Sequence, residues 1–129
     1  MRTFCTALVL ASTASGCWWQ SGEIEVERQA AKLGREEFTV HAWKAASELE
    51  RGRMTASFLR KYRATELSRQ QVEALLGAST GYYYSDSNPA YFVGPRTVGS
   101  IHGDGYLWVF DADKSTDQIR RVFFVPDVK

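Results

Sequence analysis

The middle of the chain spaces its large apolar residues as one face of a helix. Met54, Phe58 and Tyr62 recur at every fourth position, and Leu59 widens the stripe that they form. Residues four positions apart lie on the same side of an α-helix, and an amphipathic helix buries its apolar side. The spacing therefore predicts a helix over residues 53–63, with this stripe turned towards the core.

The segment before this stripe, residues 24–49, is rich in alanine and charged residues and also predicts helix. Gly34 predicts a break in it, because glycine weakens the interior of a helix. Phe38 and Trp43 are its large apolar residues, and we expect both to pack in a core instead of binding a ligand. The pattern leaves open whether this segment docks on the sheet.

The strongest local signal for a helix lies just downstream. Ser68, followed three residues later by Gln71, is the pattern of a capping box, in which each side chain binds the other residue's backbone N–H. Leu67 and Val72 stand where a hydrophobic staple closes, and Gly77 stands where a helix ends in a left-handed conformation. A helix this short needs a surface to pack on, because it is unstable alone in water.

Aromatic and β-branched residues dominate four later runs, which predicts strands. The runs comprise residues 82–84, 90–93, 106–110 and 119–125, with a glycine-rich connection over 98–105 and a polar hairpin turn over 111–117. We expect Leu107 and Val109 to face the helices, and Tyr106, Trp108 and Phe110 to face the other way. The order of elements predicts an α+β fold, a helix pair packed on a three- to four-stranded antiparallel meander.

The first residues have the composition of an export signal. Arg2 precedes an apolar run over residues 4–10, and small residues stand just before Cys17. The run is much shorter than the roughly 20 residues of a membrane-spanning helix, so the pattern predicts a cleaved signal peptide over residues 1–16. Cleavage removes Cys5 and leaves Cys17 as the only thiol, which excludes an internal disulfide.

The small residues before Cys17 resemble the lipobox of bacterial lipoproteins, in which this cysteine is acylated and becomes the first residue. Soluble export with a free Cys17, after cleavage by an ordinary signal peptidase, is the alternative. Trp18 follows the cysteine where an aspartate favours the inner membrane, so we expect a lipid anchor in the outer membrane and a domain facing the periplasm. Residues 17–37 then form a lipid-anchored tether that can hold a helix, and residues 38–129 form the folded domain.

Charge excludes one class of partner. The whole chain has a formal net charge of +1, and removal of Arg2 with the signal leaves basic and acidic residues in equal number. A nucleic-acid-binding domain needs a strong positive excess, so we expect no nucleic-acid partner. Basic residues between positions 51 and 69 could meet anionic lipid headgroups, or could form a solvated helix face.

The residues suited to catalysis or metal binding are few. His41 and His102 are the only histidines, and the run 102–104, His-Gly-Asp, is more typical of a turn than of a catalytic pair. Aspartates at 111, 113 and 117 lack the central glycine and terminal glutamate of a calcium loop. We therefore expect no enzyme activity, no metal and no cofactor.

Aromatic side chains that stay exposed are the best candidates for contact with a partner protein, because they bury a large area at little entropic cost. Tyr83, Tyr91 and Trp108 are the candidates on the predicted strands, and the alternative is that they pack against residues 24–49. His102 and Arg96, in and beside the glycine-rich connection, complete the set.

The run from Ser68 to Gly77, after a helix with Phe58-Leu59 and before tyrosine-rich strands and Leu107-Trp-Val-Phe-Asp111, resembles the SmpA/OmlA (BamE-like) superfamily of small outer-membrane lipoproteins. The resemblance implies a helix pair on a three-stranded antiparallel sheet, as in the repeats of β-lactamase inhibitor protein, on a lipidated Cys17. The best-known member of this superfamily is a component of the outer-membrane β-barrel assembly machinery. Glu66-Leu67 replaces a Gly-Met that is common in the family, and the resemblance therefore implies a relative of that component instead of the component itself.

These signals predict a non-enzymatic lipoprotein of the bacterial envelope. It would act as an accessory or scaffold through contacts with an envelope protein, in outer-membrane assembly or integrity. The alternative is a periplasmic inhibitor or ligand-binding module that uses the aromatic face of the sheet and the loop 94–105.

Overall fold

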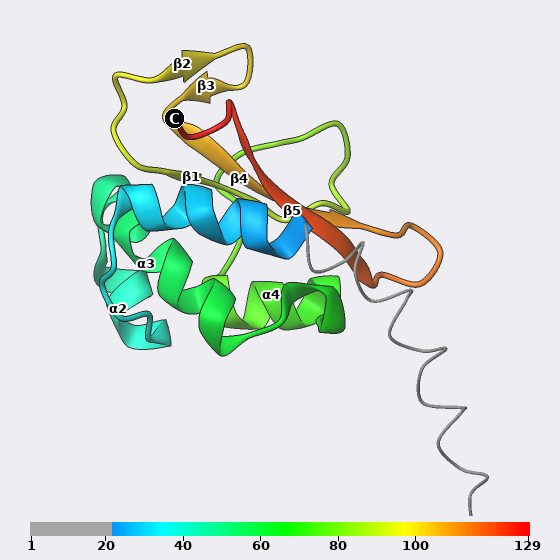
Figure 1. Cartoon of the computed structure of the whole chain (residues 1–129). Coiled ribbons are helices and arrows are strands. Elements are labelled where there is room, and N and C mark those ends of the chain that lie inside the picture. Colours follow the sequence, from blue (N-terminus) through cyan, green and yellow to red (C-terminus); the bar gives the residue numbers. More distant parts are fainter. Residues whose placement is uncertain (1–21) are drawn as a thin grey trace, which may run out of the picture.

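The computed structural model describes residues 22–129, so the predicted signal peptide, Cys17 and Trp18 lie outside the described residues. Within this range four α-helices lie on one face of an antiparallel sheet (Figure 1). The helices are residues 22–33, which we call the first helix, then α2 (Val40–Ala45), α3 (Glu48–Lys61) and α4 (Arg69–Leu76), with a 3₁₀ turn η1 (Ala64–Glu66) before α4.

The main sheet has three strands in the order β1-β4-β5, all antiparallel. Its strands are β1 (Ala90–Val93), β4 (Tyr106–Ala112) and β5 (Ile119–Val125). A small separate hairpin of β2 (Gly99–Ser100) and β3 (Gly103–Asp104) stands between β1 and β4 along the chain. The α+β architecture is confirmed, with three strands in the main sheet.

The capping box of α4 forms as predicted. Ser68 Oγ accepts from the Gln71 backbone N–H at 3.2 Å, and Gln71 Oε1 accepts from the Ser68 N–H at 2.8 Å. Gly77 ends the helix with a φ of 84°, a conformation that favours glycine. A second capping box, Ser47 with Glu50, starts α3 five residues earlier than the apolar stripe predicts.

The first helix docks on the domain, which the sequence pattern left open. Val26 and Ala30 lie in the same core as the aromatic residues of α3 and the sheet. The chain breaks at Gly34, as predicted, where φ is 148°. A Cβ at Gly34 would lie 2.7 Å from Cβ of Arg53, so the close approach of this loop to α3 requires glycine.

The predicted facing of β4 is wrong. Trp108 and Phe110 point to the helices, while Leu107 and Val109 belong to a smaller core on the opposite face. The inward rings meet Phe58 of α3 edge-on, at centroid distances of 5.4 Å and 5.9 Å. Alternate residues of β4 do point to opposite faces, but both faces are buried, so the polarity of the residues does not show which face meets the helices.

The predicted strand over residues 82–84 is also wrong. This run lies in a long loop between α4 and β1, and Tyr84 has a φ of 58°, which no strand accommodates. The loop covers the second face of the sheet (Figure 1). A Cβ at Gly81 would lie 2.4 Å from Leu107 Cδ1, so the backbone rests directly on β4.

The same loop closes the free edge of β1. Ser79 Oγ accepts from the Ala90 N–H at 3.0 Å, and Thr80 Oγ1 accepts from the Phe92 N–H at 2.8 Å. These hydroxyls satisfy strand donors that would otherwise be offered to another chain. The loop is therefore built into the sheet and is positioned by it.

We predict that Ser68→Ala lowers the free energy of unfolding by about 1 kcal/mol, because the N3 amide of α4 loses its cap. Urea denaturation monitored by far-ultraviolet circular dichroism measures this difference. Gln70→Ala is the matched control, since Gln70 is exposed on the same helix and makes no capping bond. Equal denaturation midpoints for the two variants would show that the capping box contributes nothing.

Candidate loop–hairpin patch

Three of the most exposed apolar side chains lie in the loop between α4 and β1 and at the tip of the β2–β3 hairpin, two segments that ring contacts join. Tyr82 is 57% exposed, Tyr84 67% and Ile101, at the tip of the β2–β3 hairpin, 90%. We call these three residues and His102 the loop–hairpin patch. Among residues 22–129, only Ile24, Val40 and Leu49 are other large hydrophobic residues with comparable exposure.

Ring contacts join the loop to the hairpin. The His102 ring lies 5.3 Å from Tyr83 and 5.6 Å from Tyr84, measured between centroids. Tyr83 in turn packs edge-on against Phe123 of β5 at 5.2 Å. Tyr83 is thus half-buried, and the rings of Tyr84 and His102 pack against it.

The backbone of the loop is held in a strained conformation at Tyr84. Tyr84 adopts the left-handed region, which an L-residue with a large side chain rarely enters. Asn88 fixes this shape, because its amide donates to the Tyr83 carbonyl at 3.0 Å and its oxygen accepts from the Ala112 N–H at 3.0 Å. Strain held by surrounding contacts is typical of binding sites, and here it points a tyrosine into solvent.

The hairpin is fixed as firmly at its base. The Gly105 N–H donates to the Val98 carbonyl at 2.6 Å, and Gly103 packs so closely on Phe92 that a Cβ would lie 2.8 Å from that ring. Arg96, predicted as a contact residue, reaches Glu48 and Asp104 at 3.9 Å each. Arg96 therefore links the hairpin to α3 at the edge of the patch.

Two of the candidate contact residues instead pack in the core against Trp43, which belongs to residues 24–49. Tyr91 and Trp108 are fully buried on the helix side of the sheet. The Tyr91 hydroxyl donates to the Gly77 carbonyl at 2.8 Å, and burial raises the pKa of this phenol. Trp108 stacks on Phe124 at 6.1 Å. Tyr83 and His102 of the predicted set do come together.

Tyr82, Tyr84 and Ile101 were missed as contact residues. The tyrosines looked like strand residues, although the Ser-Asp-Ser-Asn-Pro run that follows them favours a loop. Ile101 is a lone apolar residue in a glycine-rich segment, which was the available signal for an exposed tip.

His102, Asp104 and Asp113, which were considered for catalysis or metal binding, make other contacts. Among the described residues no hydrogen bond joins His102 to Asp104. Asp113 accepts from the backbone and hydroxyl of Ser115 and from the Thr116 N–H, which lowers the pKa of its carboxyl. Within residues 22–129 no group of three or more His, Cys, Asp or Glu residues is placed to hold a metal ion.

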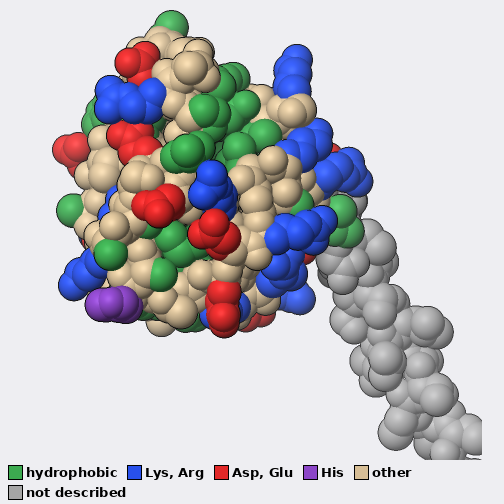
Figure 2. Space-filling view, turned by 90° about the vertical axis from the view of Figure 1, so that its left-hand side faces the viewer, with side chains coloured by type: hydrophobic (Ala, Val, Ile, Leu, Met, Phe, Trp, Pro, Cys, Tyr) green, Lys and Arg blue, Asp and Glu red, His purple; other side chains and the backbone are tan. Residues whose placement is uncertain are grey.

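The basic residues of positions 51–69 do not form one basic face. Arg53 pairs with Glu36, Lys61 with Glu37, and Arg69 with Asp117 and Glu73. Arg51 lies 4.7 Å above the Trp43 ring, where burial lowers the pKa of its guanidinium. Figure 2 shows acidic and basic side chains interspersed over the middle of one face, with Lys and Arg gathered along its right-hand side.

Comparison of the chain with protein-family models, with curated proteins and with solved structures found no match. Across residues 22–129, no helix has both the length and the apolar character that a membrane span requires.

We predict that Tyr84→Asn leaves the free energy of unfolding unchanged or raises it by up to about 1 kcal/mol, because asparagine tolerates the left-handed region better. The exposed ring contributes little burial to set against this gain. Urea denaturation beside Tyr84→Phe, which keeps the strain, measures the effect. A loss above about 1 kcal/mol in the asparagine variant alone would mean that the ring serves the fold.

Proposed function

We propose that this chain is a lipid-anchored protein of the bacterial envelope that acts by binding another protein through the loop–hairpin patch. The observation that carries the proposal is the patch itself. A strained tyrosine and a hairpin-tip isoleucine are held in solvent by a rigid base. Exposed aromatic residues on a fixed scaffold are typical contact residues of protein interfaces.

The anchor is the part that the sequence supports. Small residues before Cys17, after an apolar run too short to span a membrane, favour acylation of this cysteine. An outer-membrane location, facing the periplasm, follows from Trp18 in the next position.

The proposal includes kinship with the SmpA/OmlA superfamily and a role as an accessory or scaffold in envelope assembly. What supports it is the capped α4 helix, packed with α3 on a three-stranded antiparallel sheet. No catalytic role is assigned to any residue.

A periplasmic inhibitor is the second candidate function, on the hairpin within the loop 94–105. The aromatic face of the sheet cannot serve it, because Trp108 and Tyr91 are covered by the helices. Ile101, 90% exposed at a hairpin tip, has the shape of a group that inserts into a partner's groove. This single feature favours the candidate.

We predict that a palmitate analogue labels the protein in growing cells and that Cys17→Ala abolishes the label. Gel fluorescence after click coupling measures it. Cys5→Ala is the matched control, because that cysteine lies in the predicted signal and its loss should leave labelling intact. Labelling that survives in Cys17→Ala would contradict the anchor.

We predict that a photoreactive phenylalanine analogue at position 82 or 101 forms adducts with one envelope protein in intact cells, and that Tyr84→Ser greatly reduces the adducts at position 101. The same analogue at position 49, exposed on α3, is the control. Mass spectrometry identifies the captured protein. Adducts with a soluble enzyme would favour the inhibitor, and adducts only from position 49 would contradict the patch.

A further inference from the structure

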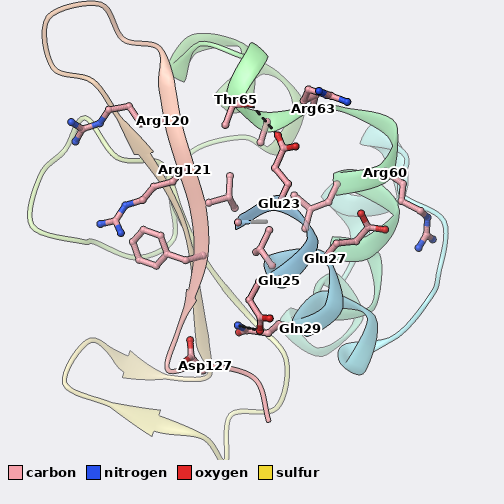
Figure 3. Close-up of a pocket in the computed structure, with 16 residues that line it drawn as sticks. Glu23, Glu25, Glu27, Gln29, Arg60, Arg63, Thr65, Arg120, Arg121 and Asp127 are labelled. Atoms are coloured by element: carbon pink, nitrogen blue, oxygen red, sulfur yellow. Dashed lines mark hydrogen bonds between the residues drawn. The ribbon is translucent and has the colours of Figure 1, made fainter. Parts of the chain in front are cut away.

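A cleft of about 650 Å³ separates the first helix from β5 (Figure 3). The end of α3 and η1 close its back. Its aliphatic lining residues come from all four elements: Val26, Leu59, Ala64 and Val122. A cavity of this size is in the range that holds small ligands.

Side-chain hydrogen bonds bridge the structure at the two ends of the cleft. At one end the Thr65 hydroxyl donates to Glu23 at 3.0 Å, and at the other the Val128 N–H donates to Gln29 at 2.9 Å. Figure 3 shows the Glu23–Thr65 bond at the start of the first helix and Gln29 further along it. One bond thus ties the helix to η1 and the other ties it to the chain after β5, and we call the space between the helix and β5 the slot.

The arginines that line the slot do not make it a site for anions. Four acidic and four basic residues line it. Arg120 and Arg121 both bind Asp111, at 3.2 Å and 3.0 Å. Figure 3 shows that both, like Arg60, point away from the space between the first helix and β5. The aliphatic residues named above, together with Phe123, form an apolar wall of the slot, which suits a linear apolar chain.

We propose that this cleft binds one fatty acyl chain, and that its occupant is an acyl chain carried on Cys17. This inference rests on the lipidation in the proposed function. Gly22 lines the cleft and is five residues from Cys17, a separation that spans at most roughly 17 Å of extended chain. The predicted anchor therefore begins within reach of the slot.

An acyl chain in the cleft has a consequence for the anchor. Stable membrane attachment depends on how many chains enter the bilayer, so sheltering one chain weakens the hold of the others. The cleft would let the domain exchange between a firmly and a loosely attached state. None of its lining residues belongs to the loop–hairpin patch, although Phe123, which lines it, packs against Tyr83.

The test compares two forms of the mature chain, residues 17–129, in the same nanodisc-containing buffer. One is the lipidated protein and the other carries Cys17→Ser. The probe is cis-parinaric acid, a fatty acid that fluoresces in apolar surroundings. We expect the Cys17→Ser protein to bind the probe and the lipidated protein to bind it about ten-fold more weakly, because its own chain occupies the slot.

Leu59→Gln and Val122→Gln in the Cys17→Ser protein should each weaken probe binding about ten-fold, by placing an amide among aliphatic groups. Leu49→Gln is the matched control, since Leu49 is exposed on the same helix as Leu59 and away from the cleft. Circular dichroism melting checks that all variants are folded.

Failure of the Cys17→Ser protein to bind the probe would overturn the acyl site. Equal binding by both forms would overturn the tethered chain as occupant and leave a site for free lipid. Intact-mass analysis of the membrane-purified protein separates a failure of the proposed lipidation from a failure of the cleft as a lipid site. An unmodified Cys17 refutes the lipidation and the tethered occupant, while the Cys17→Ser titration still tests the cleft.

Discussion

The structure depends on the edge-to-face packing of Phe58 in α3 against Trp108 and Phe110 in β4. These rings lie 5.4 Å and 5.9 Å apart and join the helical layer to the central strand of the sheet. Trp43 of α2 extends the cluster to Trp108 at 6.0 Å, and its indole N–H donates to the Leu76 carbonyl at the end of α4. The cluster thus ties α2, α3 and α4 to one strand.

This packing determines where the molecule can make contacts. Because the helices cover Tyr91, Trp108 and Phe110, the exposed aromatic rings among residues 22–129 are Tyr82 and Tyr84 of the loop between α4 and β1. That loop is itself fixed, because Gly81 packs closely on Leu107 and Asn88 is hydrogen-bonded to Tyr83 and to Ala112 at the end of β4. The binding surface is therefore an outer layer built on a filled core.

The sequence predicted the positions of helices and strands from local signals, but it did not predict which side chains face the core and which are exposed. The capping residues of α4 and the β-branched run of β5 predict those elements because neighbouring residues alone determine them. The facing of Trp108 depends on which layer covers it, and residues 82–84 leave the extended conformation because the loop packs on Leu107. Contacts between distant segments have no local pattern, so the sequence did not predict that the tyrosine loop and the hairpin would meet.

Amide hydrogen exchange of the membrane-anchored protein, measured in isolated envelopes and after purification, tests the binding surface most directly. A partner seated on the loop–hairpin patch should slow exchange in envelopes at residues 82–85 and 100–103, and leave α2 and the start of α3 unchanged. Slower exchange over α2 and α3, with no change at those two segments, would contradict the account.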